Sequence, residues 1–296
     1  MREYRLVSDY RQVEVLRKSF FDLAKQTFGL DFNEWYDRGF WNDSYICYSF
    51  VDGEHIIANA SVNKMVLTSG GKEYKAIQIG TVMTHPDYRN QGLATKLMKH
   101  VIEKYEKEYE LIYLFANETV LDFYPKFGFQ KVLESSYSLA VSDLKKEVAL
   151  RSALRKLDVD NLADFELMKE FATERIPVSS TLGVKGNEHL LMFYFILVFR
   201  DALYYDQNED VILLFEQEDH VLHVFDIVSK RKIDLEKVVS RIISEKTEFI
   251  QFHFVPDSDN ENIRSTLVTE TDDTLFVLPS CANARKPVKF PLTSHA

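Results

Sequence analysis

The sequence predicts an α/β fold (α+β class) built as two successive units, each with a mixed, mostly antiparallel sheet flanked by helices. Three observations predict it. The chain has 296 residues, which exceeds the usual size of one domain. Strand-like segments with β-branched residues alternate with segments of helical periodicity along the whole chain. The element order of the first half then returns in the second half.

The first unit, expected at residues 1–145, follows the order β-α-α-β-β-β-α-β-α-β. Asp9 is expected to cap its first helix, because apolar residues recur at helical spacing from Val13 to Ala24. The turns at Asp52-Gly53 and Gly70-Gly71 favour hairpins. The strands are expected at 4–8, 44–51, 55–67, 74–84, 111–116 and 130–140, and the later helices at 33–40, 93–109 and 120–126.

The second unit is expected at residues 150–296, after a linker near 142–152. Its pattern gives strands at 153–157, 202–206, 210–215, 220–228, 249–255 and 274–278, and helices at 161–173, 188–200, 233–245 and 260–267. Little residue identity accompanies this repeated order, so the second unit is expected to be a degenerate copy.

Charge and composition exclude several classes of function. The net charge of −10 disfavours binding to nucleic acid or to an anionic membrane, and it suits cationic amine substrates. No run of 18 apolar residues and no signal-peptide pattern occurs, so a cytoplasmic protein is expected. Cys47 and Cys281 are expected to be reduced thiols, with a disulfide or a catalytic thiol as alternatives. Metal-ligand spacing is absent, and the sequence does not indicate an oligomeric state.

An anion-binding loop is predicted between a strand that ends at Thr84 and a helix that begins at Leu93. Unpaired backbone N–H groups and the helix dipole would favour a phosphate there. Gly92 would let the backbone approach the ligand, and Arg89 would add charged donors. The alternative is an ordinary loop with a solvated arginine.

The segment from Ile77 to Val132 resembles the core of the GNAT superfamily of acetyl-CoA-dependent N-acetyltransferases. Two motifs in the right order carry the resemblance. The first is Val82-Met83-Thr84-His85-Pro86-Asp87-Tyr88-Arg89-Asn90-Gln91-Gly92-Leu93-Ala94. The second is Phe123-Tyr124-Pro125-Lys126-Phe127-Gly128-Phe129, with Asn117 between them. The resemblance implies two tandem acyl-CoA N-acyltransferase folds and acetyl-CoA as co-substrate.

The resemblance also implies roles for these residues. Backbone groups of Val82, Met83 and Thr84 would pair with the pantetheine arm, and the N–H of Met83 or Val82 would stabilise the thioester oxygen. The pyrophosphate would bind the N–H groups of Arg89, Asn90, Gln91, Gly92, Leu93 and Ala94. Tyr124 would protonate the departing thiolate, or else pack against Phe127. Asn117 would reach the cofactor arm, or cap the segment that starts at Glu118.

The general base is not predicted. Relatives often carry a glutamate eight residues before the proline of the first motif, and this chain has Gln78 there. Glu118 and His85 are alternatives, as are a water relay and an amine that arrives deprotonated.

The acceptor pocket is expected to form from the first two helices, the hairpin near Gly70 and the second unit. Trp35, Tyr36 and Asp37 could bind a cationic amine there, or could be the core-facing side of a helix. In the second unit, residues 228–233 take the place of the phosphate loop without a glycine, which favours a unit kept for packing.

The second motif and the two-unit order are also similar to the enhanced-intracellular-survival type of aminoglycoside acetyltransferase. Those proteins have a third, sterol-carrier-like domain, and their terminal carboxylate takes part in the active site. The 296 residues leave no room for that domain, and residues 290–296 are expected to form a final strand of the second unit. The leading hypothesis is direct acetyl transfer from acetyl-CoA to a primary amine of a small molecule or peptide. The alternatives are a non-catalytic acyl-CoA-binding or regulatory module and a purely structural protein.

Overall fold

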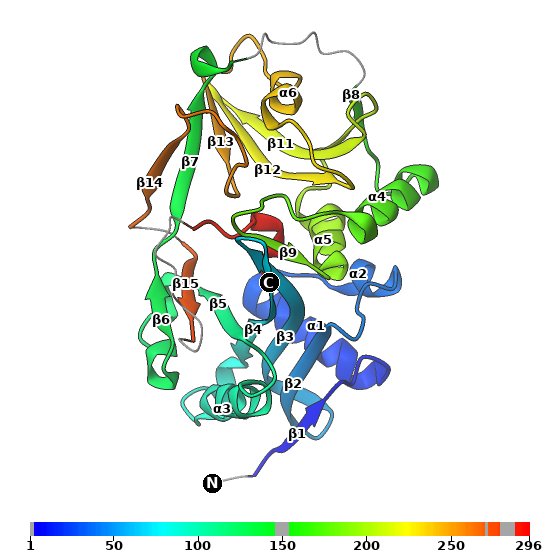
Figure 1. Ribbon diagram of the computed structural model, residues 1–296. Helices are drawn as coiled ribbons and strands as arrows, with labels where there is room; N and C mark the ends of the chain where they lie inside the picture. Colours follow the sequence, from blue (N-terminus) through cyan, green and yellow to red (C-terminus); the bar gives the residue numbers. More distant parts are fainter. Residues whose placement is uncertain (1–2, 146–153, 270–271, 279–287) are drawn as a thin grey trace.

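The computed structural model describes residues 3–145, 154–269, 272–278 and 288–296, which form two sheets arranged one above the other (Figure 1). The helices are α1 (Glu14–Phe28), α2 (Asn33–Asp37), α3 (Leu93–Tyr105), α4 (Leu162–Glu174), α5 (Glu188–Phe193) and α6 (Leu235–Ser240). The strands of the first half are β1 (Arg5–Ser8), β2 (Tyr45–Asp52), β3 (His55–Ser69), β4 (Lys72–Thr84), β5 (Leu111–Ala116), β6 (Gln130–Val132) and β7 (Ser135–Ala140). Those of the second half are β8 (Leu154–Lys156), β9 (Gly183–Lys185), β10 (Leu203–Asp206), β11 (Val211–Glu218), β12 (Val221–Ser229), β13 (Phe249–Phe252), β14 (Arg264–Leu267) and β15 (Thr274–Val277).

The first sheet has the strand order β1-β2-β3-β4-β5-β15-β6. The short strand β9 pairs with Val66, Leu67 and Thr68 near the C-terminal end of β3. Its β4 and β5 are parallel, and its other pairs are antiparallel. The buried residues of α1 and of α3 belong to two separate apolar clusters, so the two helices cover opposite faces of this sheet.

The second sheet repeats this arrangement in the order β8-β10-β11-β12-β13-β7-β14. Its parallel pair is β12 and β13, which stand where β4 and β5 stand in the first sheet. The predicted fold class, two successive units with mixed and mostly antiparallel sheets, is therefore confirmed.

The two units exchange one strand each, which the sequence pattern did not reveal. The segment 130–140, expected as one closing strand, divides into β6 in the first sheet and β7 in the second sheet. In return β15, expected in the second unit, lies between β5 and β6 of the first sheet. The break falls at Glu134, a buried carboxylate that accepts a hydrogen bond from the N–H of Phe290 at 2.8 Å.

Three element predictions need correction. Asp9 does not cap the first helix, because that helix begins at Glu14 after Val13 and Asp9 has a φ of +51°. The expected helix at 260–267 is instead the edge strand β14, whose pairing with β7 overrides its weak helical periodicity. The expected helix at 233–245 is shorter in the structure, where α6 spans Leu235–Ser240. In contrast, Asn161 caps α4 by accepting from the N–H groups of Ala163 and Asp164.

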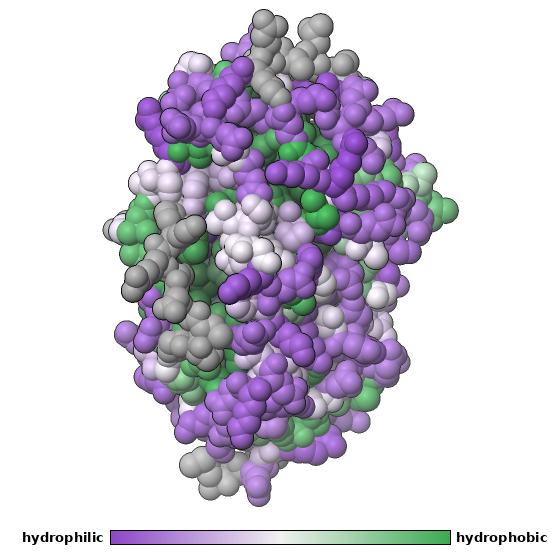
Figure 2. Space-filling model, in the orientation of Figure 1, coloured by the Kyte–Doolittle hydropathy of each residue, from purple (hydrophilic) through white to green (hydrophobic). Residues whose placement is uncertain are grey.

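The larger apolar cluster runs from α1 through α2 and α5 into the second sheet, so the two units share one core. The face drawn in Figure 2 is mainly hydrophilic, with apolar residues in small separate areas. None of the helices in the described part of the chain is both long enough and apolar enough to span a membrane.

Candidate active site

A cleft of about 830 Å³ opens in the first sheet where β4 and β5 separate. Their parallel pairing runs from Ala76–Leu111 to Ile79–Leu114, and the two strands diverge beyond it. Backbone groups on the β5 side of β4 therefore face the cleft instead of a neighbouring strand. The residues that line it are Thr27, Phe28, Leu30, Ile79, Gly80, Thr81, Val82, Met83, Thr84, Arg89, Ala94, Phe115, Ala116, Asn117, Thr119, Val120, Phe123, Tyr124, Asp273 and Ala296.

The second half of β4 is bent by a bulge that directs it toward this cleft. Its register against β3 shifts between Asn59 and Ser61, and Thr81 adopts a φ of +43°. The side-chain amide of Asn59 donates to the carbonyl of Thr81 at 2.9 Å and holds the bulge. Val82, Met83 and Thr84 follow the bulge and line the cleft, in the place where the resemblance puts the pantetheine-binding strand.

The loop after β4 leads into the N-terminus of α3 as predicted. Gly92 precedes the helix with a φ of +74°, and the N–H of Lys96 makes the first helical bond to its carbonyl. The N–H groups of the first turn before Lys96 are thus outside the helical hydrogen-bond ladder, and the helix dipole adds positive potential there.

The predicted phosphate-loop residues occupy different positions. Arg89 is exposed at the mouth of the cleft, where its Nε donates to the carbonyl of Thr84 at 3.4 Å. Ala94 also lines the cleft. Asn90, Gln91 and Gly92 are exposed on the loop beside it, and the side chain of Leu93 packs in the core below α3.

Tyr124 lies inside the cleft, at the start of a short 3-10 turn that Gly128 ends with a φ of +90°. Its ring packs against Phe129 and Phe276 of the exchanged strand β15. Burial raises the pKa of its phenol to about 12. The phenol is therefore a neutral proton donor across the physiological pH range.

Asn117 caps a turn and also lines the cleft. Its side-chain oxygen accepts from the N–H of Thr119 at 3.1 Å, which caps the following turn. It also lines the cleft at the end of β5. The alternatives for the base lie elsewhere: Glu118 is exposed outside the cleft, and His85 caps a turn by accepting from the N–H of Asp87.

Ala296 fills the point at which β4 and β5 diverge. A Cβ atom on Gly80 would lie 2.9 Å from both the carboxyl carbon and the carboxyl oxygen of Ala296, so only glycine leaves room for it. Gln78, which is fully buried, donates to the carbonyl of Ser294 and accepts from the N–H of Ala296, both at 2.7 Å. The expected final strand at 290–296 is therefore wrong, because this segment enters the first unit.

A second carboxyl group, that of Asp273, lines the same cleft. Burial and the neighbouring Asp272 raise the pKa of Asp273. The aromatic rings of Phe28 and Phe115 complete this part of the wall. Sequence reasoning missed Ala296, Asp273 and Gly80, although the neutral Gln78 was a signal that a carboxylate would have to come from another segment.

Trp35, Tyr36 and Asp37 do not lie in this cleft. The indole of Trp35 is buried and donates to the carbonyl of His189 at 2.7 Å, across the boundary between the units. The guanidinium carbon of Arg17 lies over the ring of Tyr36, 4.1 Å from the ring centre. Asp37 is exposed. The end of α1 lines the cleft instead, through Thr27 and Phe28.

Cys47 is a free and fully buried thiol whose pKa burial raises to about 12. Its thiolate is therefore not available as a nucleophile. Cys281, the other expected thiol, lies outside the described residues.

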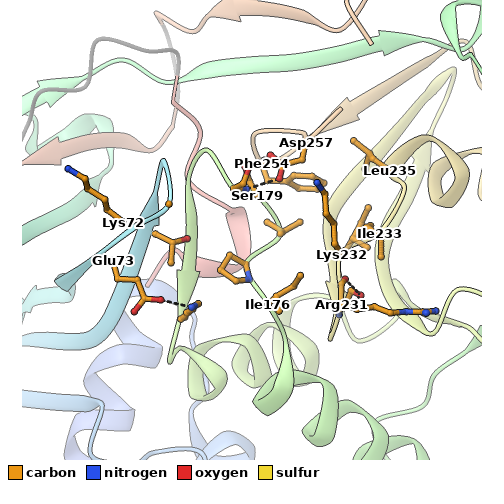
Figure 3. Close-up of a pocket in the computed structure, with 18 residues that line it drawn as sticks. Lys72, Glu73, Ile176, Ser179, Arg231, Lys232, Ile233, Leu235, Phe254 and Asp257 are labelled. Atoms are coloured by element: carbon orange, nitrogen blue, oxygen red, sulfur yellow. Dashed lines mark hydrogen bonds and ion pairs between the residues drawn. The ribbon is translucent and has the colours of Figure 1, made fainter. Parts of the chain in front are cut away.

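A second cavity of about 370 Å³ lies between the hairpin of β3 and β4 and the segment that replaces the phosphate loop in the second unit (Figure 3). Its walls include Ile176, Ile233 and Phe254. Asp257 is bonded to the hydroxyl of Ser179 at 3.2 Å. The hairpin near Gly70, expected at the acceptor pocket, lines this cavity instead.

Comparison with known sequences finds similarity in the first half of the chain. Residues 8–132 match the profile of the acetyltransferase (GNAT) domain. A segment of 61 residues is 39% identical to N-alpha-acetyltransferase 50 of Danio rerio. That match covers 19% of this chain and only 36% of the zebrafish protein.

Solved structures share the fold of both units. A probable N-acyltransferase from Enterococcus faecalis V583 superposes with a TM-score of 0.61 at 15% identity, over 93% of this chain and 72% of that chain. Eis1 from Mycobacterium abscessus superposes with a TM-score of 0.57 at 15% identity, over the same shares of the two chains. A GCN5-related N-acetyltransferase from Kribbella flavida gives 0.56 at 17% identity, over 93% and 71%.

Proposed function

We propose that this chain, whose residues 8–132 match the acetyltransferase (GNAT) domain, transfers the acetyl group of acetyl-CoA to a primary amine of a small molecule or peptide. The observation that carries the proposal is the cleft between the diverging strands β4 and β5, which Tyr124 and Arg89 both line. Transfer would take place directly between the two bound substrates, because Cys47 is buried away from the cleft.

Acetyl-CoA supplies the thioester whose acyl group moves to the amine. Backbone groups of Val82, Met83 and Thr84 would hold its pantetheine arm as an added strand, and an N–H of Met83 or Val82 would stabilise the developing oxyanion. The N–H groups at the start of α3, with the guanidinium of Arg89, would bind the pyrophosphate.

Two groups would move the protons. When the nitrogen–carbon bond forms and the carbon–sulfur bond breaks, Tyr124 would give its phenolic proton to the departing thiolate. The proton lost by the amine would go to a carboxylate that lines the cleft, such as that of Asp273. The proton gained there and the proton lost from Tyr124 balance, and exchange with solvent restores both groups.

The acceptor site is proposed at the end of the cleft beyond the thioester. Asp273 offers a carboxyl group there, and Phe28 and Phe115 offer aromatic rings. This combination favours an acceptor that carries a positive charge beside the neutral amine that reacts. Trp35, Tyr36 and Asp37 then act by packing the two units together.

The test is an acetylation assay with a panel of polyamines, amino sugars and short peptides, read by mass spectrometry as the gain of one acetyl group. Tyr124→Phe should lower kcat by about a hundredfold or more and change KM little, because a general acid contributes roughly 10²–10⁴. Since the pKa of Tyr124 is about 12, the wild type should show no loss of kcat from this group up to about pH 10.

Phe225→Leu, remote from the cleft, serves as the matched aromatic control. Full turnover in Tyr124→Phe would remove the acid assignment. Binding of acetyl-CoA without transfer to any amine would favour the rival function, a non-catalytic acyl-CoA-binding module.

A further inference from the structure

The second unit has a cavity where two of its strands separate, as β4 and β5 do in the first unit. The parallel pairing of β12 with β13 ends at Val224 and Phe252, and β12 then continues to Ser229. Ile227 and Ser229 of this continuation, with Phe254 beyond β13, line the cavity of about 370 Å³ drawn in Figure 3. We infer that this cavity binds a small organic anion, which has an apolar body and one phosphate or carboxylate group.

The cavity is too small to be a second cofactor cleft, with about 370 Å³ against about 830 Å³ between β4 and β5. The hairpin of β3 and β4 forms one of its walls. The N–H of Gly70 donates to the carbonyl of Ser180 at 3.3 Å, and the hydroxyl of Ser69 donates to the carbonyl of Thr181 at 2.9 Å. These bonds hold the first unit against the second, so a ligand smaller than an acyl-CoA is expected.

The apolar part of the ligand would contact a wall that is already formed. Ile176 lines the cavity, and its N–H donates to the carbonyl of Ser229 at 2.9 Å. The next residues pack closely on β9, because a Cβ atom on Gly183 would clash with Pro177 and with the carbonyl of Ser179. A preformed apolar wall binds an apolar group at a low cost in ordering.

Two acidic side chains line the cavity, and each already has donors. Glu73 forms an ion pair with Lys185, which joins the two units. Asp257 accepts from the N–H of Ser180 at 2.8 Å and from the hydroxyl of Ser179 at 3.2 Å. Both carboxylates are engaged with the protein, which leaves the other basic side chains for a ligand.

Lys232 is the cation best placed to bind the anionic group. In Figure 3 its side chain extends toward Phe254, whereas the ends of Lys72 and Arg231 point away from the cavity. Lys232 forms no ion pair within the part of the chain that the structure describes. The hydroxyl of Thr68, which also lines the cavity, is buried and has no hydrogen-bond partner among those residues. A lysine and a free hydroxyl suit a phosphate or a carboxylate.

Isothermal titration calorimetry with phenyl phosphate, benzoate, benzyl alcohol and benzylamine tests this inference, because the four probes share an aromatic ring and differ in charge. The two anions should bind one site per chain, and the alcohol and the amine should bind about threefold more weakly or less. Lys232→Gln should weaken the binding of phenyl phosphate about three- to fivefold, as for an exposed ion pair, and Lys232→Arg should keep it.

Lys246→Gln is the matched control. Lys246 is an exposed lysine of the second unit that lines neither the cavity nor the cleft. Its carbonyl lies 3.1 Å from Nδ1 of His220, at the opposite end of β12. This variant should bind phenyl phosphate as the wild type does.

Equal affinity in Lys232→Gln and Lys246→Gln would overturn the inference, and so would equal binding of benzylamine or no binding of either anion. Arg89→Ala should bind phenyl phosphate normally. Loss of binding in Arg89→Ala would instead assign the anion to the cleft between β4 and β5. The readout does not involve acetyl transfer, so failure of the proposed function would leave this inference standing.

Discussion

At the scale of single residues, Gln78 shows how one neutral side chain can bind the backbone of a distant segment. The sequence places a glutamine where relatives often carry a glutamate, and the structure explains the difference. An amide can donate to the carbonyl of Ser294 and accept from the N–H of Ala296 at once. A carboxylate can only accept, and its charge would oppose the carboxyl group of Ala296.

Gln78→Glu is therefore expected to lower kcat roughly tenfold or more, although it restores the residue usual in relatives. The lost donor leaves a buried acceptor unsatisfied, which costs about 1–3 kcal/mol and loosens the chain end. Steady-state kinetics would measure this, with Gln251→Glu as a control, because Gln251 lies in the second sheet and donates to Tyr137. An active or faster Gln78→Glu would show that the strand position itself supplies the base.

The residues of the two motifs were predictable, and those of the acceptor end were not. Local spacing predicted the helix start after Gly92 and the turn at Tyr124, because each depends on residues within a few positions of it. Trp35 fills the core between the units instead of binding substrate, since its partner His189 is 154 residues away. No local pattern contains that contact.

At the scale of elements, the divergence of β4 and β5 creates the cleft, and Ala296 lies in it beside Gly80. The bulge at Thr81 bends β4, and the parallel pairing stops at Ile79. The sequence predicted both strands within two residues of their ends, but not the segment that enters between them.

Gly80→Ala tests this arrangement. The added Cβ would lie 2.9 Å from the carboxyl carbon of Ala296, so the last residue must move. The expected result is a lower kcat together with a loss of stability, because the new Cβ meets backbone atoms of Ala296, although the φ of Gly80 itself suits alanine. In a double-mutant cycle with deletion of Ala296, the second change should add little. Fully additive losses would contradict an effect through the chain end.

At the scale of the whole molecule, the exchange of β7 and β15 places one strand from each half of the chain in the sheet of the other half. Each sheet takes its sixth strand from the other half of the chain: β15 lies beside β5 in the first sheet, and β7 lies beside β13 in the second. Tyr124 packs on Phe276 of the exchanged strand, so the proposed acid depends on residues from both halves. The division of the chain at 145–150 remains a prediction of where the second unit begins in the sequence. In the structure, β7 and β15 each lie in the sheet of the other unit.

The repeated element order could be read from hydrophobic periodicity, which records local burial. The exchange could not, since β6 and β7 form one continuous strand-like run in the sequence and separate only at Glu134. The hydrogen bonds that separate them come from Lys289 and Phe290, far along the chain. Long-range pairing of this kind leaves no periodic signal.

The central claim is that the cleft between β4 and β5 binds acetyl-CoA, and thermal unfolding with and without the cofactor tests it most directly. A ligand at about 100 times its dissociation constant adds roughly 2.7 kcal/mol to stability, which raises the unfolding midpoint clearly. We expect that rise in the wild type and in Arg264→Ala, whose arginine is exposed on the edge strand β14, and its loss in Arg89→Ala. No rise in the wild type, or an equal rise in Arg89→Ala, would contradict the account.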